Sequence, residues 1–220
     1  MLAALLASLA LAAAEPPRGR VIEEVVAVVR NPASAPPRAV TLTKLTEEAR
    51  VALVSRGATG AATGPLDREA LRAALDWLLD QMLLADDAAR LRIDEVPHEQ
   101  VLAELRRFAA RFASAAEYER FLVASELTEE ELRVTLARTV RVQRYLDSRI
   151  GRAARVDEAE VDRWLAEHGA AGSGAAIRDA ARAEIAEERA RVQVRELVAE
   201  LRGRADIRIL ERLRPAAGEG

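Results

Sequence analysis

The sequence predicts a mainly α-helical protein that carries a small β-sheet. Half of its 220 residues are apolar but only 3% are aromatic, so its core has to be built from Leu, Val, Ile and Ala. The abundant Ala and Arg are strong helix formers, and from residue 44 onward the apolar residues recur every three or four positions, as on one face of a helix. Segments with strand character stand near the two ends, at residues 21–29 and 207–210.

The chain opens with an apolar segment, MLAALLASLALAAA, at residues 1–14. A transmembrane helix needs about 20 apolar residues, so this segment is too short to span a bilayer. It is typical of a signal peptide, with small residues before the cleavage point. We therefore predict export to the periplasm. The chain has no cysteine, which excludes disulfides and thiolate chemistry.

Three short segments are expected to form the sheet. Residues 21–29 (VIEEVVAVV) are rich in β-branched residues, which favour strands, and residues 39–42 (AVTL) follow a proline-rich segment at 31–37 that we interpret as a loop. A two-stranded ribbon is marginal on its own. Residues 207–210 (IRIL) alternate like a strand, and we expect them to supply the third partner.

The helical part of the sequence carries clear start signals. Asp67 is a predicted N-cap, and Ser114, Thr128 and Asp157 each precede a glutamate by three residues, as in a capping box. We expect the strongest amphipathic helix after Asp67, with an outward Asp86–Arg90 pair. The other predicted starts are Lys44, Pro97 and Ile177.

A long last helix is expected after a linker, GAAGSGAA, at residues 169–176. It runs from Ile177 to Arg202, with Gly203 as the residue that ends it. Glu187 and Arg191 lie four positions apart on its outer face.

No constellation in the sequence predicts catalysis, a cofactor or a metal site. His98 and His168 fall at helix ends and have no metal-ligand spacing, so we interpret both as surface residues. The glycines at 57, 60 and 64 are not followed by the Gly-Lys-Ser/Thr of a P-loop. The formal net charge is −3, and nucleic acid is not an expected partner. Arg138, Arg141 and Arg144 form a basic helix face, most simply a solvated one.

The order of these segments resembles the SurA-type periplasmic chaperones (SurA N-terminal domain family). The resemblance covers residues 20–168, through VIEEVVAVVRN, LRAALDWLLDQMLLADDAARLRI, VPHEQVLAELRRFA and VDEAEVDRWLAEH. Residues 177–210 resemble the helix and strand that close the N-terminal core in that family. In such chaperones parvulin-type isomerase domains normally intervene, but here only residues 169–176 stand at that point.

The resemblance implies one SurA-like chaperone domain over residues 15–214, followed by a disordered tail at 215–220. It also implies an ATP-independent holdase that binds unfolded exported or outer-membrane proteins, without prolyl isomerase activity and without stable membrane insertion. Exposed apolar patches mark sites where other chains bind. We predict that some of the larger apolar residues line a peptide groove, although the same residues are equally suited to the core. They are Trp77, Met82, Phe108, Phe112, Tyr118 and Phe121.

Two other functions fit the same sequence. An adaptor or structural subunit would hold one fixed partner, or a second copy of itself as a homodimer. A third hypothesis is a prolyl isomerase, but the absence of a parvulin-like segment argues against it.

Overall fold

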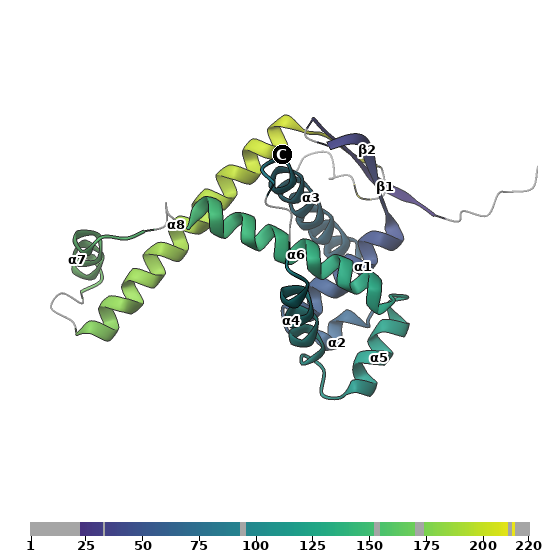
Figure 1. Cartoon of the computed structure of the whole chain (residues 1–220), viewed down its shortest axis with the longest axis horizontal. Helices are drawn as coiled ribbons and strands as arrows, with labels where there is room; N and C mark the ends of the chain where they lie inside the picture. The colour runs from purple at the N-terminus through teal and green to yellow at the C-terminus, as the bar shows by residue number, and fades with distance from the viewer. Residues whose placement is uncertain are drawn as a thin grey trace, which may run out of the picture.

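A computed structural model describes residues 23–32, 34–92, 96–151, 155–169, 174–210 and 213. Within these residues the protein is mainly helical with one small antiparallel sheet, which confirms the predicted fold class (Figure 1). The predicted signal peptide at 1–14 and the predicted tail at 215–220 lie outside the described residues. The elements follow one another as β1 (Val25–Asn31), β2 (Ser34–Thr41), α1 (Leu42–Ser55), α2 (Thr59–Ala62), α3 (Arg68–Arg90), α4 (His98–Ala109), α5 (Ala115–Ala124), α6 (Glu129–Ile150), α7 (Glu158–Glu167), α8 (Ala175–Arg204) and β3 (Asp206–Ile209).

The sheet joins the two ends of the described chain. Its strand order is β2-β1-β3, so the late strand β3 pairs with β1 as the sequence predicted. The pairing is antiparallel and places Ala27 opposite Ile209 and Val29 opposite Ile207. These four side chains face the helices, where Ala27 and Val29 are buried.

The second strand is longer than the sequence predicted. We expected a loop over residues 31–37, but β2 begins at Ser34, and Asn31 is already paired with it. The prolines at 36 and 37 therefore lie inside β2. This is possible because β2 is an edge strand, where a residue without an N–H is tolerated, and because the pairing is irregular between Val29 and Asn31.

The starts of α3, α5, α6 and α7 were predicted correctly, because each has a local cause in its capping residue. Asp67 accepts a hydrogen bond from the backbone N–H of Ala70 at 2.8 Å, and Thr128 and Asp157 form complete capping boxes. At Ser114 the box is incomplete, since Glu117 binds the backbone N–H of Ala113 instead.

Several helix boundaries differ from the sequence prediction. Helix α1 begins at Leu42, which was expected to end the second strand, rather than at Lys44. The short helix α2 was not expected within the glycine-rich segment, and Pro97 is the N-cap of α4 rather than its first helical residue. Helix α8 begins at Ala175 and continues through Gly203, which was expected to end it. No positive φ is needed there, and the chain enters β3 through an extended Ala205 instead.

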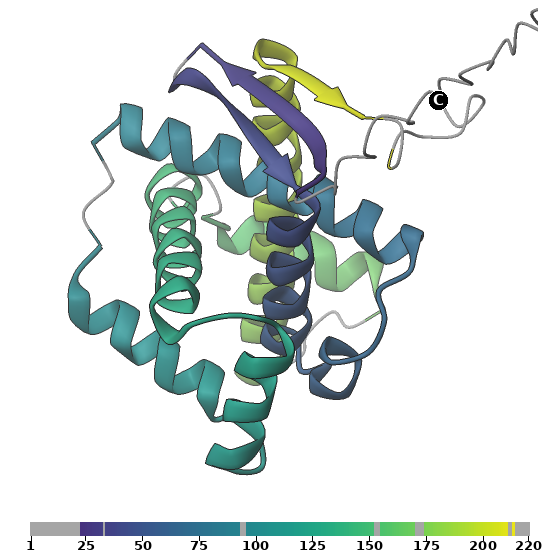
Figure 2. The ribbon, with the colours of Figure 1, turned by 90° about the vertical axis from the view of Figure 1, so that its right-hand side faces the viewer.

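The core consists of two large clusters beside each other in the body of the protein. One lies between the sheet, α3, the end of α6 and the last turns of α8, and includes Leu75, Tyr145 and Leu201. The other lies between α1, α4, α5 and the first turns of α6 (Figure 2). We call the described residues 23–151, 190–210 and 213 the body.

A smaller unit, which we call the arm, projects from this body. It comprises α7 and residues 175–189 of α8, and it lies at the end of the molecule far from the sheet (Figure 1). Its own core is small, with Val161, Leu165 and Ala181 buried between the two helices. Because α8 has 30 residues, it is about 45 Å long, and one helix thus serves both the body and the arm.

Candidate functional site: the cleft between α6 and α8

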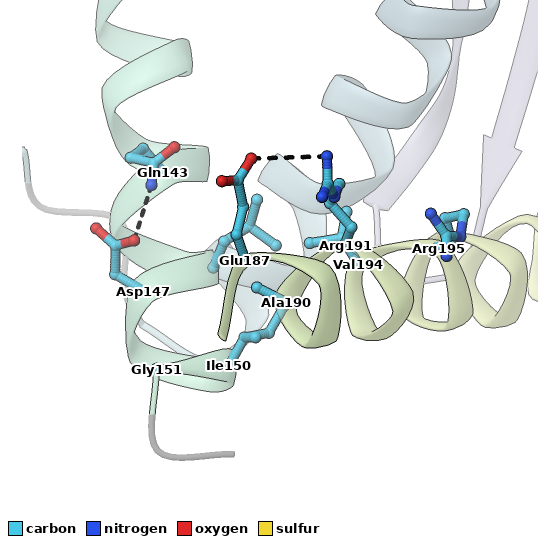
Figure 3. A pocket seen from close by; sticks show the side chains of 10 residues that line it. Gln143, Asp147, Ile150, Gly151, Glu187, Ala190, Arg191, Val194 and Arg195 are labelled. Atoms are coloured by element: carbon cyan, nitrogen blue, oxygen red, sulfur yellow. Dashed lines mark hydrogen bonds and ion pairs between the residues drawn. The ribbon is translucent and has the colours of Figure 1, made fainter. Parts of the chain in front are cut away.

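An open cleft lies where the end of α6 passes the middle of α8, at the junction of arm and body. Its volume is about 720 Å³. Figure 3 shows side chains from both helices directed into it. The cleft is lined by Gln143, Leu146, Asp147, Ile150, Gly151, Glu187, Ala190, Arg191, Val194 and Arg195.

One face of α8 connects the cleft to the core. Ala190 and Val194 lie one turn apart, and Leu197 and Leu201 continue the same stripe into the body. Spacings of three and four residues keep these side chains on one side of a helix. Leu197 and Leu201 are buried, whereas Ala190 and Val194 line the cleft beside the end of α6 and stay half-buried.

The floor of the cleft is apolar and its rim is charged. Leu146 and Ile150 of α6 and Ala190 and Val194 of α8 supply the apolar part of the lining. On the rim the polar contacts run within each helix: Gln143 donates to Asp147 at 2.7 Å, and Arg191 lies 3.6 Å from Glu187. The second of these confirms the predicted pair. An apolar floor between charges of both signs suits a partly apolar polypeptide segment.

Exposed ion pairs join the two helices of the arm beside its small apolar core. Arg178 bridges Glu158 at 2.7 Å and Asp162 at 2.6 Å, and Arg182 also binds Glu158. Hydrogen bonds from Arg178 and Arg182 lower the pKa of the Glu158 carboxyl. Such exposed pairs contribute little each and are screened by salt.

The body, in contrast, holds buried acids. Glu48 is fully buried between α1 and α6, where Arg138 and Thr135 donate to it and Lys44 lies 3.3 Å away. Burial alone would raise the pKa of Glu48, but its bonds to Arg138 and Lys44 outweigh burial and lower it. Part of the predicted basic face on α6 is thus used inside the fold.

Two neighbouring aspartates fix α3 to the sheet and to α6. Asp86 accepts from Asn31 at 2.9 Å and from Arg38 at 2.5 Å, which corrects the expected outward Asp86–Arg90 pair. Arg90 binds Asp87 instead, and the Tyr145 hydroxyl donates to Asp87 at 2.5 Å. The pair forms with Asp87 because Asp86 points into the sheet.

The residues predicted for a peptide groove do not form one continuous surface. Met82, Phe108 and Phe121 are buried in the two core clusters. The rings of the half-buried Phe112 and Tyr118 pack at a tilt with centroids 5.7 Å apart, and Phe112 also contacts Phe108 and Phe121 in the same cluster.

Trp77 lies apart from them, half-buried in a small pocket of about 160 Å³ between α1 and α3. The residues that line the larger cleft were not proposed from the sequence as groove residues. The signal that could have identified them is the apolar stripe of α8, because it extends beyond the part of the helix that packs on the body.

The two histidines lie at the surface. His98 begins α4, and His168 stacks on Trp164 with ring centroids 3.9 Å apart. Within the described ranges, no three His, Asp or Glu side chains come together in a way that could hold a metal ion. Nor does any helix in that part of the chain have the length and apolarity to cross a membrane.

Comparison of the chain with protein-family models, with curated proteins and with solved structures found no match.

Proposed function

We propose that this chain is an ATP-independent holdase of the periplasm, similar to the SurA-type chaperones, which binds unfolded exported polypeptides in the cleft between α6 and α8. The apolar segment at residues 1–14, which is typical of signal peptides, supports the location. The order of helices and strands that resembles SurA supports the class of function.

The observation that carries the proposal is the arm. A helix that needed only to pack on the body would begin near Ala190, but α8 begins several turns earlier, at Ala175, and α7 lies beside these extra turns beyond the cleft. The result is a concave, solvent-open surface with Leu146, Ile150 and Val194 on its floor. Chaperones need such a surface because their clients expose apolar side chains.

The cleft is suited to weak and reversible binding. Each 100 Å² of apolar surface buried contributes about 2.5 kcal/mol, and ordering an unfolded client offsets much of this gain. The expected dissociation constant is therefore about micromolar. Binding at this strength needs no ATP for release.

Two valines on α8 provide a matched test. Val194 lines the cleft, whereas Val192, two residues earlier, is 36% exposed and lies outside the lining. We expect Val194→Glu to lose most of the protection that the protein gives a diluted, denatured outer-membrane protein against aggregation, measured by light scattering. Val192→Glu should protect like the unchanged protein.

The result also separates the alternatives. No protection by the unchanged protein at a large molar excess would reject the holdase. Stoichiometric capture of one folded partner, lost in Val194→Glu, would instead support an adaptor that uses the same cleft.

A further inference from the structure

The outer edge of β3 exposes backbone groups in a regular pattern. The N–H of Leu210 donates to the carbonyl of Val26 at 2.9 Å, and Arg208 lies opposite Val28 in the same register. Hydrogen-bonded and non-hydrogen-bonded pairs alternate along an antiparallel ladder. Arg208 and Leu210 therefore bond toward β1, while Ile207 and Ile209 direct their N–H and C=O groups away from it.

No strand of the described residues pairs with that side, since the sheet order ends at β3. In Figure 2, β3 (yellow) forms one margin of the sheet. An unpaired strand edge is a template for another extended chain.

The side chains of β3 divide between the two faces of the sheet. Ile207 and Ile209 are half-buried and pack on the body core. Asp206 and Arg208 are exposed on the other face, where they pair at 3.1 Å, and Arg30 of β1 lies opposite Asp206 in the ladder. The exposed face thus carries charges that alternate in sign both along β3 and across the sheet.

We propose that β3 is the interface for a second copy of this chain, whose own β3 adds to the edge in the antiparallel direction about a two-fold axis at Ile207. In this register Ile207 of each copy exchanges both backbone hydrogen bonds with Ile207 of the other. The two three-stranded sheets become one continuous sheet. The contact is self-complementary, as a two-fold interface has to be.

The charges favour a second copy over an arbitrary strand. The axis at Ile207 places Asp206 of each copy opposite Arg208 of the other, which continues the alternation that begins at Arg30. Opposite charges in directly facing positions stabilise a sheet and like charges destabilise it. A strand of unrelated sequence has the same backbone groups but does not match these charges.

The test is sedimentation equilibrium of the full chain and of charge variants. The unchanged protein is expected to form a concentration-dependent dimer. Arg208→Asp puts two carboxylates opposite each other at both symmetry-related positions and should weaken dimerisation about tenfold. Reversing all three charges with Arg30→Asp, Asp206→Arg and Arg208→Asp again places opposite charges in every facing pair. This variant should have a dissociation constant close to that of the unchanged protein.

A backbone variant tests the edge itself. Ile207→Pro removes an N–H that points away from β1, so it should abolish the dimer. It also removes a side chain that packs on the body core, so Ile207→Ala, which loses most of the same packing but keeps the N–H, is its control and should still dimerise. The matched substitution Arg208→Pro removes a bond to β1 and should lower the melting temperature.

Three results would overturn the proposal. They are a protein that stays monomeric at its highest soluble concentration, a dimer that Ile207→Pro leaves intact, and failure of the reversed row to recover the affinity lost in Arg208→Asp. Binding of an unfolded client that Ile207→Pro abolishes in a monomeric protein would assign the edge to clients instead. Because the cleft lies on other elements, Val194→Glu should not change dimerisation.

Discussion

The body and the arm are built from the same helix α8 but are stabilised by different interactions. The body buries leucines and valines in two large clusters and locks Glu48, Asp86 and Asp87 between its elements. The arm buries only three side chains, with a few half-buried apolar residues packed against them, and adds exposed arginine–carboxylate pairs. Regions with little buried apolar surface open at low free-energy cost, so the arm is the part of the molecule suited to adjust to a bound chain.

Helix α8 is also packed more tightly in the body than towards the arm. Near its end Arg202 binds Asp80 of α3 at 2.5 Å, and Leu197 and Leu201 are buried in the body core. Between that region and the arm, the helix contributes the half-buried Ala190 and Val194 to the cleft. The cleft therefore marks the boundary between a firmly packed region and a loosely packed one.

The largest expected effect comes from equal leucine truncations in the two regions. Leu75 in the body is 0% exposed and Leu165 in the arm is 1% exposed. Leu75→Ala should lower the free energy of unfolding by about 2–5 kcal/mol, measured by urea denaturation. Leu165→Ala should leave that transition nearly unchanged and accelerate hydrogen exchange in α7 alone. Equal losses of global stability would show that arm and body unfold as one unit.

The next effect concerns the buried acid of the body. Glu48→Gln removes the negative charge that Arg138 and Lys44 share and should cost about 2 kcal/mol of folding free energy. Its neighbour Glu47 pairs with the same Lys44 at 3.1 Å but keeps 15% of its side chain exposed, and Glu47→Gln should cost less, about 1 kcal/mol. A Glu48→Gln protein as stable as the Glu47→Gln control would contradict the assigned role.

Acid should destabilise the body through the same groups. Burial alone would raise the pKa values of Glu48 and Asp87, but the hydrogen bonds and charges of their partners lower both below the ordinary 4.5 and 3.8. A lowered pKa adds stability that is complete above the unfolded-state value and is lost as the pH falls through the folded-state value. We expect unfolding free energies that are steady above about pH 5 and fall below it, with a smaller fall in Glu48→Gln. An identical acid dependence in both proteins would contradict this.

Salt should produce the smallest effect, and only in the arm. The pairs of Glu158 with Arg178 and Arg182 are exposed, and molar salt shortens the screening length to about 3 Å. Hydrogen exchange in α7 should become faster, while exchange in α3 stays the same. Equal protection of α7 at low and high salt would show that its apolar contacts alone hold it.

The sequence predicted the fold where causes are local. The caps at Asp67, Thr128 and Asp157 bind within one turn, so they can be recognised from spacing, and the late strand 207–210 was identified from its alternation and from the need for a third strand. Strand β2, which contains Pro36 and Pro37, and the hydrogen-bond partners of Asp86 depend on elements far away in sequence. Local propensities cannot predict such contacts.

The site was harder to predict for the same reason. Large aromatic residues such as Phe108 and Phe121 attracted attention as groove residues, but the fold uses them as core. The cleft instead depends on how far α8 extends past the end of α6, a distance that no motif encodes. Ala190 and Val194 are ordinary helix residues until α6 is placed beside them.

The central claim is that clients bind at the junction of body and arm, and site-specific photo-cross-linking tests it most directly. A photoreactive residue at position 190, on the cleft floor, should cross-link to an unfolded outer-membrane polypeptide with high yield. The same residue at Val123, which is 79% exposed on α5 far from the cleft, should cross-link weakly. Equal yields at both positions, or a higher yield at position 123, would contradict the account, because binding would then follow exposed apolar surface rather than the cleft.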